Sequence, residues 1–107
     1  MRLCDVSAAG ASTLVARGLL NLAHRDGSSE PAPLEPGRRY TVRVPLDAAA
    51  YAFRPGHRLR LAVSPTYWPW AWPSPDPVTL TVHTGGPTRL ELPVRPPRDE
   101  DGHATTF

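Results

Sequence analysis

The chain has 107 residues and a formal net charge of +2, with 12 basic residues that are all arginine and 10 acidic residues. Basic and acidic residues are interleaved, which argues against nucleic acid as a partner because nucleic-acid-binding domains concentrate positive charge on one surface. The 14 prolines and 8 glycines favour short strands and turns over long helices, since proline breaks helix interiors. The length fits one small domain.

Cys4 is the only cysteine, which excludes an internal disulfide and argues against a cysteine-based metal site. The four histidines are far apart and show no ligand spacing, so we expect neither a metal nor a cofactor. No apolar run approaches the roughly 20 residues that span a bilayer, and the first residues lack the pattern of a signal peptide. We therefore expect no membrane partner and a cytoplasmic location.

The first half of the chain predicts strands separated by polar turns. Residues Arg2 to Val6 are expected to end a strand, and Ser12 to His24 form a longer extended segment with inward leucines. Gly18 interrupts that segment, and a glycine at such a point predicts a β-bulge. After a polar loop, Tyr40 to Leu46 alternates apolar and polar residues with the period of a strand.

The second half continues the same pattern. Arg58 to Ser64 is the clearest strand of the chain, with three apolar side chains on one side and two arginines on the other. Val78 to His83 and Thr88 to Val94 alternate in the same way. Residues 96–107 are polar and predict a disordered tail, which leaves a folded domain over residues 1–95.

Five or six short strands with turns between them predict an all-β sandwich. The inward residues are few for a closed sandwich, and the chain opens almost inside a strand. A sheet built in this way has an unpaired edge, which natural proteins avoid or cover. We therefore expect an incomplete sandwich that lacks N-terminal strands and is part of a larger domain.

The strand Arg58 to Ser64 leads into residues 65–75, here called the tryptophan loop, which hold all three tryptophans. In an extended backbone Trp68, Trp70 and Trp72 would project to the same side. Three interpretations stay open: docking on another domain, local packing at the end of the sandwich, and contact with a sugar or another ligand. The candidate site residues are Tyr67, Trp68, Trp70 and Trp72.

Exposed arginines form a second feature of the predicted surface. They are expected to make an outward stripe across neighbouring strands, and they are Arg38, Arg39, Arg43, Arg58 and Arg60. Such a stripe is either solvated, with partial pairing to nearby acids, or it faces an acidic partner.

The sequence shows no catalytic site of its own. A serine hydrolase needs a nucleophile, a histidine base and an orienting acid, and no Gly-x-Ser-x-Gly motif is present. A triad of Ser64, His57 and Asp76 is conceivable, but the sequence signals no pocket around it. The simpler interpretation is that His57 forms hydrogen bonds in its turn and that Ser64 ends its strand, so no catalytic residue is assigned.

The run Arg54-Pro55-Gly56-His57-Arg58-Leu59-Arg60-Leu61-Ala62-Val63-Ser64 resembles the C-terminal jelly-roll domain of the Xaa-Pro dipeptidyl-peptidase and cocaine-esterase hydrolases. Upstream, residues 2–6 and 12–21 are similar to the central hairpin of that domain, and residues 34–46 are similar to its next element. The resemblance covers about residues 2–95. It implies a galactose-binding-like jelly-roll β-sandwich, with further strands ahead of residue 1.

The resemblance also implies a partner. Members carry an α/β-hydrolase domain with a Ser-Asp-His triad, N-terminal to the jelly roll, and they cleave peptide, ester or related acyl bonds. The chain is then expected to be a non-catalytic accessory domain that covers or shapes the cleft of a hydrolase domain, supplied by the same or a separate chain, with possible oligomer contacts. The alternatives are a free-standing carbohydrate-binding sandwich that uses the tryptophan loop, and a gene fragment without independent function.

Overall fold

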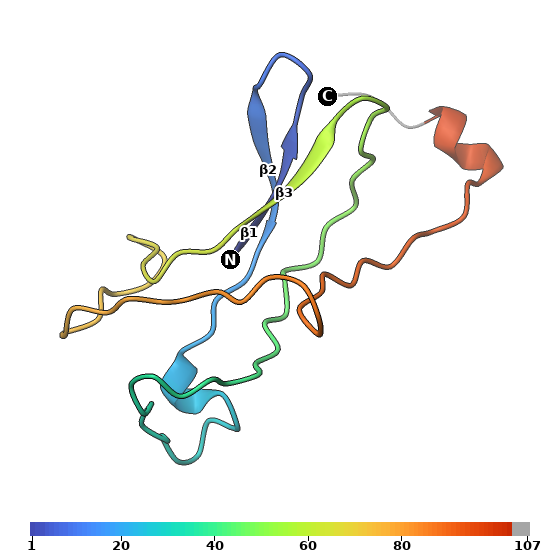
Figure 1. Ribbon diagram of the computed structural model, residues 1–107. Coiled ribbons are helices and arrows are strands. Elements are labelled where there is room, and N and C mark those ends of the chain that lie inside the picture. Colours follow the sequence, from blue (N-terminus) through green and yellow to red (C-terminus); the bar gives the residue numbers. More distant parts are fainter. Residues whose placement is uncertain (104–107) are drawn as a thin grey trace.

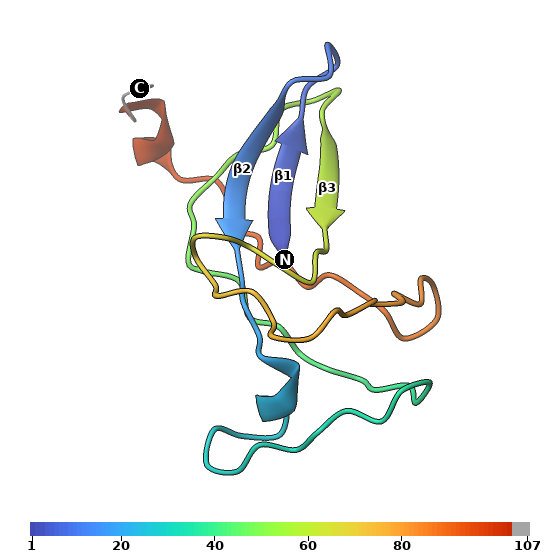
Figure 2. The ribbon, with the colours of Figure 1, turned by 90° about the vertical axis from the view of Figure 1, so that its left-hand side faces the viewer.

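The computed structural model describes residues 1–103 and contains one antiparallel sheet (Figure 1). Its strands are β1 (Arg2–Val6), β2 (Ser12–Arg17) and β3 (Arg58–Ala62), in the order β2-β1-β3. Two short 3₁₀ helices, η1 (Leu22–His24) and η2 (Asp99–His103), complete the regular structure of these residues. Figure 2 shows the sheet face-on, with β1 between the other two strands.

The register of the sheet contains one irregularity, and it does not lie at Gly18. Leu3 pairs with Ala16 and Cys4 pairs with Leu14, so Val15 is the extra residue of a bulge in β2. The prediction of a bulge at Gly18 is therefore wrong. Gly18 follows the last residue of β2 and is glycine for a different reason: a Cβ there would lie 2.1 Å from the carbonyl oxygen of Pro45.

The buried core of the described residues is small. Its apolar members are Leu3, Val6 and Ala16, and the only buried charged residue is Asp5. All four come from β1 and β2. Since a domain is stabilised mainly by the apolar area it buries, this core gives the described chain little stability of its own.

Three predicted strands do not form. Tyr40 to Leu46, Val78 to His83 and Thr88 to Val94 belong to no sheet. The first of them keeps the predicted alternation, with Val42, Val44 and Leu46 half-buried and the residues between them exposed. The missing element is a neighbouring strand, because a strand needs a ladder of hydrogen bonds to a partner and the pattern alone does not supply one.

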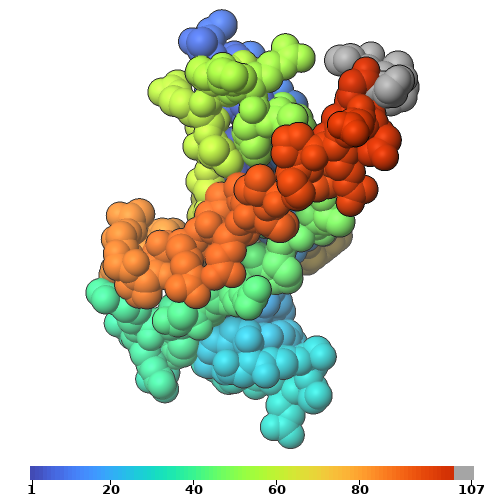
Figure 3. Space-filling model, turned by 90° about the vertical axis from the view of Figure 1, so that its right-hand side faces the viewer, coloured from blue at the N-terminus to red at the C-terminus, as the bar shows by residue number. Residues whose placement is uncertain are grey.

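Two of the segments outside the sheet cross one another. Figure 3 shows the orange and red part of the chain crossing the green part, and an ion pair of 3.8 Å between Arg43 and Glu91 joins the two. The predicted tail begins within this region, where Arg95 pairs with Asp101 at 2.6 Å. Residues 104–107 of that tail lie outside the described residues, and the predicted boundary at residue 95 stays a prediction.

The chain is more open than a closed domain. Its radius of gyration is 17.0 Å, whereas a compact domain of this length has about 13 Å. Its accessible surface is 9360 Å², whereas a folded monomer of this mass exposes about 5,900 Å². The fold is therefore all-β, as predicted, and it is an incomplete sandwich in which residues 1–103 form one sheet and no second sheet.

Candidate functional site

The tryptophan loop begins where β3 ends, and local hydrogen bonds shape it. The hydroxyl of Ser64 donates to the carbonyl of Thr66 at 2.7 Å and accepts from the Thr66 amide at 3.3 Å. Further along, the Ala71 amide donates to the carbonyl of Tyr67 at 2.9 Å, which closes one turn. A turn of this kind brings residues four apart together, so the backbone is not extended here.

The turn separates the three tryptophans. The rings of Trp68 and Trp72 meet edge to face, with 5.1 Å between their centroids. Trp70 instead lies over the end of β2, where the guanidinium carbon of Arg17 is 3.4 Å from the ring centroid. The expectation that all three rings form one row is therefore wrong, because the backbone turns at the residues between them.

All three tryptophans remain exposed. The exposed fractions are 60% for Trp68, 57% for Trp70 and 84% for Trp72. Tyr67 is half-buried, and the guanidinium of Arg2 in β1 lies 5.2 Å from its ring centroid. The contacts with Arg2 and Arg17 are cation–π interactions, which anchor the loop to the sheet and leave outer ring faces open to solvent.

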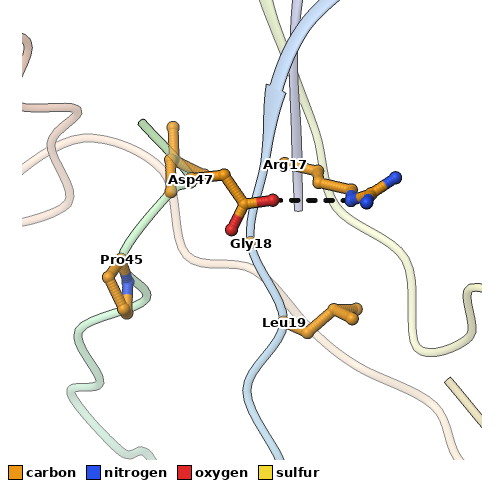
Figure 4. A pocket seen from close by; sticks show the side chains of 6 residues that line it. Arg17, Gly18, Leu19, Pro45 and Asp47 are labelled. Atoms are coloured by element: carbon orange, nitrogen blue, oxygen red, sulfur yellow. Dashed lines mark ion pairs between the residues drawn. The ribbon is translucent and has the colours of Figure 1, made fainter. Parts of the chain in front are cut away.

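A shallow cavity of about 240 Å³ lies beside this anchor (Figure 4). Gly18, Leu19, Pro45 and Leu46 contribute to its wall, and the ion pair between Arg17 and Asp47 crosses it at 3.5 Å. The Asp47 amide also donates to the carbonyl of Arg17 at 2.7 Å. The end of β2 is thus held from two sides, by Asp47 and by Trp70.

A polar cluster around the buried Asp5, which the sequence did not predict, lies at the other end of the sheet. The carboxylate of Asp5 accepts a hydrogen bond of 2.7 Å from the Tyr51 hydroxyl and contacts Nδ1 of His57 at 2.9 Å. The turn that presents His57 contains Gly56 with φ +79°, a conformation that glycine adopts without strain. A carboxylate at a core-facing position of a strand requires hydrogen-bonding partners. The acid at such a position was therefore the feature of the sequence that could have predicted this cluster.

These contacts set the protonation of the cluster. The hydrogen bond from Tyr51, aided by the hydrogen bond and charge of His57, lowers the pKa of Asp5 against the opposing effect of burial. The same hydrogen bond to Asp5, together with loss of water contact, raises the pKa of Tyr51. The cluster therefore holds one ionised carboxylate and one neutral phenol over a wide range of pH.

The cluster does not form a hydrolase triad. His57 pairs with Asp5, and the hydroxyl of Ser64 is bonded to Thr66. Within residues 1–103 no hydrogen bond joins Ser64, His57 and Asp76. The hydrogen bonds of these residues do not support a triad of the three. The His57 ring contacts Asp5 on the neighbouring strand, and the His57 amide donates to Arg54 within its turn, as expected.

The described part of the chain has no group of three or more His, Cys, Asp and Glu residues arranged to hold a metal ion. Its helices are too short to cross a bilayer. Cys4 is a free, half-buried thiol.

Comparison with known proteins gives one match. Residues 1–105 match the family model of the X-Pro dipeptidyl-peptidase C-terminal non-catalytic domain. No curated protein and no solved structure matches the chain. The family match covers nearly the whole sequence and includes the sheet, the polar cluster and the tryptophan loop.

Proposed function

The chain belongs to the family of X-Pro dipeptidyl-peptidase C-terminal non-catalytic domains, and on that premise we propose that it docks on a hydrolase catalytic domain through the tryptophan loop. Membership gives the chain a peptidase catalytic domain as its general partner. We further propose that this partner is an α/β-hydrolase with a serine triad, and that the chain covers or shapes its active-site cleft. The sheet would then be part of a jelly-roll sandwich.

The large exposed surface of the chain supports the proposal that it forms an obligate interface with a partner domain. The accessible area exceeds that of a compact monomer of the same mass by about 3,500 Å². Obligate interfaces bury about 2,000–5,000 Å² counted over both partners, so the excess surface of this chain is large enough for its half of such an interface. An obligate contact would therefore supply the apolar burial that the three-residue core lacks.

The single observation that carries the proposal is the exposure of three tryptophans on one loop that is anchored to the sheet. Tryptophan is the residue type most enriched among interface residues that dominate binding free energy. Here Trp70 and Tyr67 are positioned by arginines of the sheet, while Trp72 is almost fully open to solvent. A loop positioned in this way loses little conformational entropy on docking, which favours affinity.

Capture from the source cells tests the proposal. An antibody against this chain should recover a species that reacts with a fluorophosphonate probe for active-site serines and that cleaves a chromogenic X-Pro amide. Recovery of the chain without a probe-reactive hydrolase would contradict the proposal. A single probe-reactive polypeptide carrying the epitope would place both domains in one chain, whereas two polypeptides would place them in separate chains.

A second candidate function rests on Trp72 alone. Its open ring is suited to stack on a sugar ring, so a carbohydrate-binding module remains the competing proposal. That proposal predicts a change of tryptophan fluorescence when an oligosaccharide is added and loss of the response in Trp72→Ala. An unchanged spectrum across a broad glycan panel would contradict it.

A further inference from the structure

We propose that the outer edge of β3 is a docking site for an extended peptide segment in which acidic and apolar residues alternate. This proposal concerns the sheet and does not depend on the tryptophan loop. The supporting observations are the unpaired outer edge of β3, its exposed side chains and two arginines that have no acidic partner within residues 1–103.

The first observation is the state of the two sheet edges. β3 pairs only with β1, in an uninterrupted register from Arg2 with Ala62 to Val6 with Arg58. Its other edge has no strand beside it in the described chain, as Figure 2 shows. An edge of this kind presents regularly spaced amide and carbonyl groups that can pair with an added strand.

The edge of β2 is different. Its ladder is broken by the bulge at Val15, and the Asp47 amide already occupies the carbonyl of Arg17. Bulges of this type hinder the addition of a further strand. β3 has neither a bulge nor a proline, so it is the edge that remains open for pairing.

The second observation is the exposure of apolar side chains along β3. Leu59 and Leu61 point to one side of the sheet with exposed fractions of 52% and 39%. Across the ladder they pair with Asp5 and Leu3, which are buried. The two leucines are thus uncovered at the outer edge of the sheet, and apolar side chains of an added strand would cover them.

The third observation is charge on the opposite side of the strand. Arg58 and Arg60 are exposed, and neither has an acidic partner within 4.0 Å among residues 1–103. Directly opposed opposite charges stabilise neighbouring strands, whereas like charges destabilise them. An incoming strand is therefore favoured when its residues facing these arginines are glutamate or aspartate.

The same charges disfavour a second copy of this chain at the edge. If two β3 strands pair antiparallel with their leucines on the same side, arginines of the two copies face each other. That arrangement places like charges in direct opposition. The occupant is therefore a different segment, with acids opposite Arg58 and Arg60 and apolar residues opposite Leu59 and Leu61.

A labelled peptide of about eight residues that alternates glutamate and valine tests the proposal on the 107-residue chain. Fluorescence anisotropy should show binding, and amide hydrogen exchange of residues 58–62 should slow on saturation. Two matched peptides serve as controls. One replaces every glutamate with lysine, and the other carries N-methyl groups along one backbone edge; both should bind at least about tenfold more weakly.

Charge reversal in the protein provides the second arm. In the double variant Arg58→Glu and Arg60→Glu, the affinity for the acidic peptide should fall by about tenfold. The affinity for the lysine peptide should rise by about tenfold. If circular dichroism shows that the variant does not fold, the proposal is still tested on the parent chain by the N-methylated peptide and by the exchange of residues 58–62. Equal binding of acidic and lysine peptides, unchanged exchange at residues 58–62, or self-association as the only effect would each overturn the proposal.

Discussion

The guanidinium carbon of Arg17 lies 3.4 Å from the centroid of the Trp70 ring, so the last residue of β2 holds the tryptophan loop against the sheet. The two residues are far apart in sequence, so the pattern of residues alone does not predict that they are in contact. Because Arg17 also pairs with Asp47, three separate segments meet at this one guanidinium. The position of the loop is therefore set by the sheet.

The coupling between Arg17 and Trp70 is measurable. A double-mutant cycle of Arg17→Ala and Trp70→Ala, followed by urea unfolding, should give a coupling free energy of about 0.5–1 kcal/mol, the range of exposed cation–π pairs. The matched cycle of Arg17→Ala and Trp72→Ala should give almost none, because Trp72 contacts Trp68 instead. Equal coupling in both cycles would contradict the observed geometry.

The carboxylate of Asp5 should make the stability of the chain sensitive to acid. Its pKa is lower in the folded chain than the ordinary value of 3.8, chiefly because Tyr51 donates a hydrogen bond to the charged form. A lowered pKa stabilises the fold above pH 3.8, and this stabilisation is lost as the pH falls below that value. In Asp5→Asn, the melting temperature should fall at pH 7 and should change less than in the parent between pH 4 and about pH 2. A parallel acid dependence in the two proteins would show that Asp5 is not the responsible group.

Tyr51 should produce the corresponding effect in alkali. Its pKa is raised above 10.0 by the hydrogen bond to Asp5, so its contribution is complete below pH 10.0 and is lost as the pH rises past the folded value. Tyr51→Phe should lower the melting temperature at neutral pH and weaken the alkaline dependence. Spectroscopic titration of the phenol provides the direct check, and an ordinary titration midpoint would contradict the hydrogen bond.

Gly18 should tolerate no side chain. A Cβ at this position would lie 2.1 Å from the backbone oxygen of Pro45 and 3.1 Å from Leu46, so the segment packed on β2 would have to move. We expect Gly18→Ala to destabilise the chain by about 1–3 kcal/mol, the usual cost of overpacking. Gly102→Ala is the matched control, since a Cβ there meets no atom within 4 Å. Similar stability of the two variants would argue that residues 45–46 do not pack on β2.

The sequence predicted those features that depend on local pattern. Alternation located β3, although the strand ends at Ala62 and not at Ser64, and Arg2 to Val6 was correctly expected to be extended. Proline and glycine frequencies favoured short strands over long helices, and the described residues contain only short helices. The same alternation at Val78 to His83 gave no strand, because pairing depends on a neighbour that a pattern cannot supply. The tryptophans lie in a loop after β3, but their contacts depend on a turn at Tyr67 and on distant Arg17, which the sequence pattern does not show.

The polar cluster shows the other limit of the sequence. His57 was expected to form hydrogen bonds within its own turn. Its amide does so, donating to the carbonyl of Arg54 at 3.1 Å, but its ring reaches Asp5 across the sheet. An acid among inward residues indicates that partners exist, because burial of an unpaired carboxylate is unfavourable. It does not indicate which residues they are, since the partners lie 46 and 52 positions further along the chain.

The affinity of the chain for its hydrolase catalytic domain, with the two expressed as separate polypeptides, tests the docking proposal most directly. Trp68→Ala and Trp72→Ala should each weaken binding by about 2–4 kcal/mol, which is roughly 30-fold to 1,000-fold in Kd. Val94→Ala, a change at an 89% exposed apolar residue outside the loop, should leave Kd nearly unchanged. If all three variants bind as tightly as the parent chain, the tryptophan loop is not the docking surface.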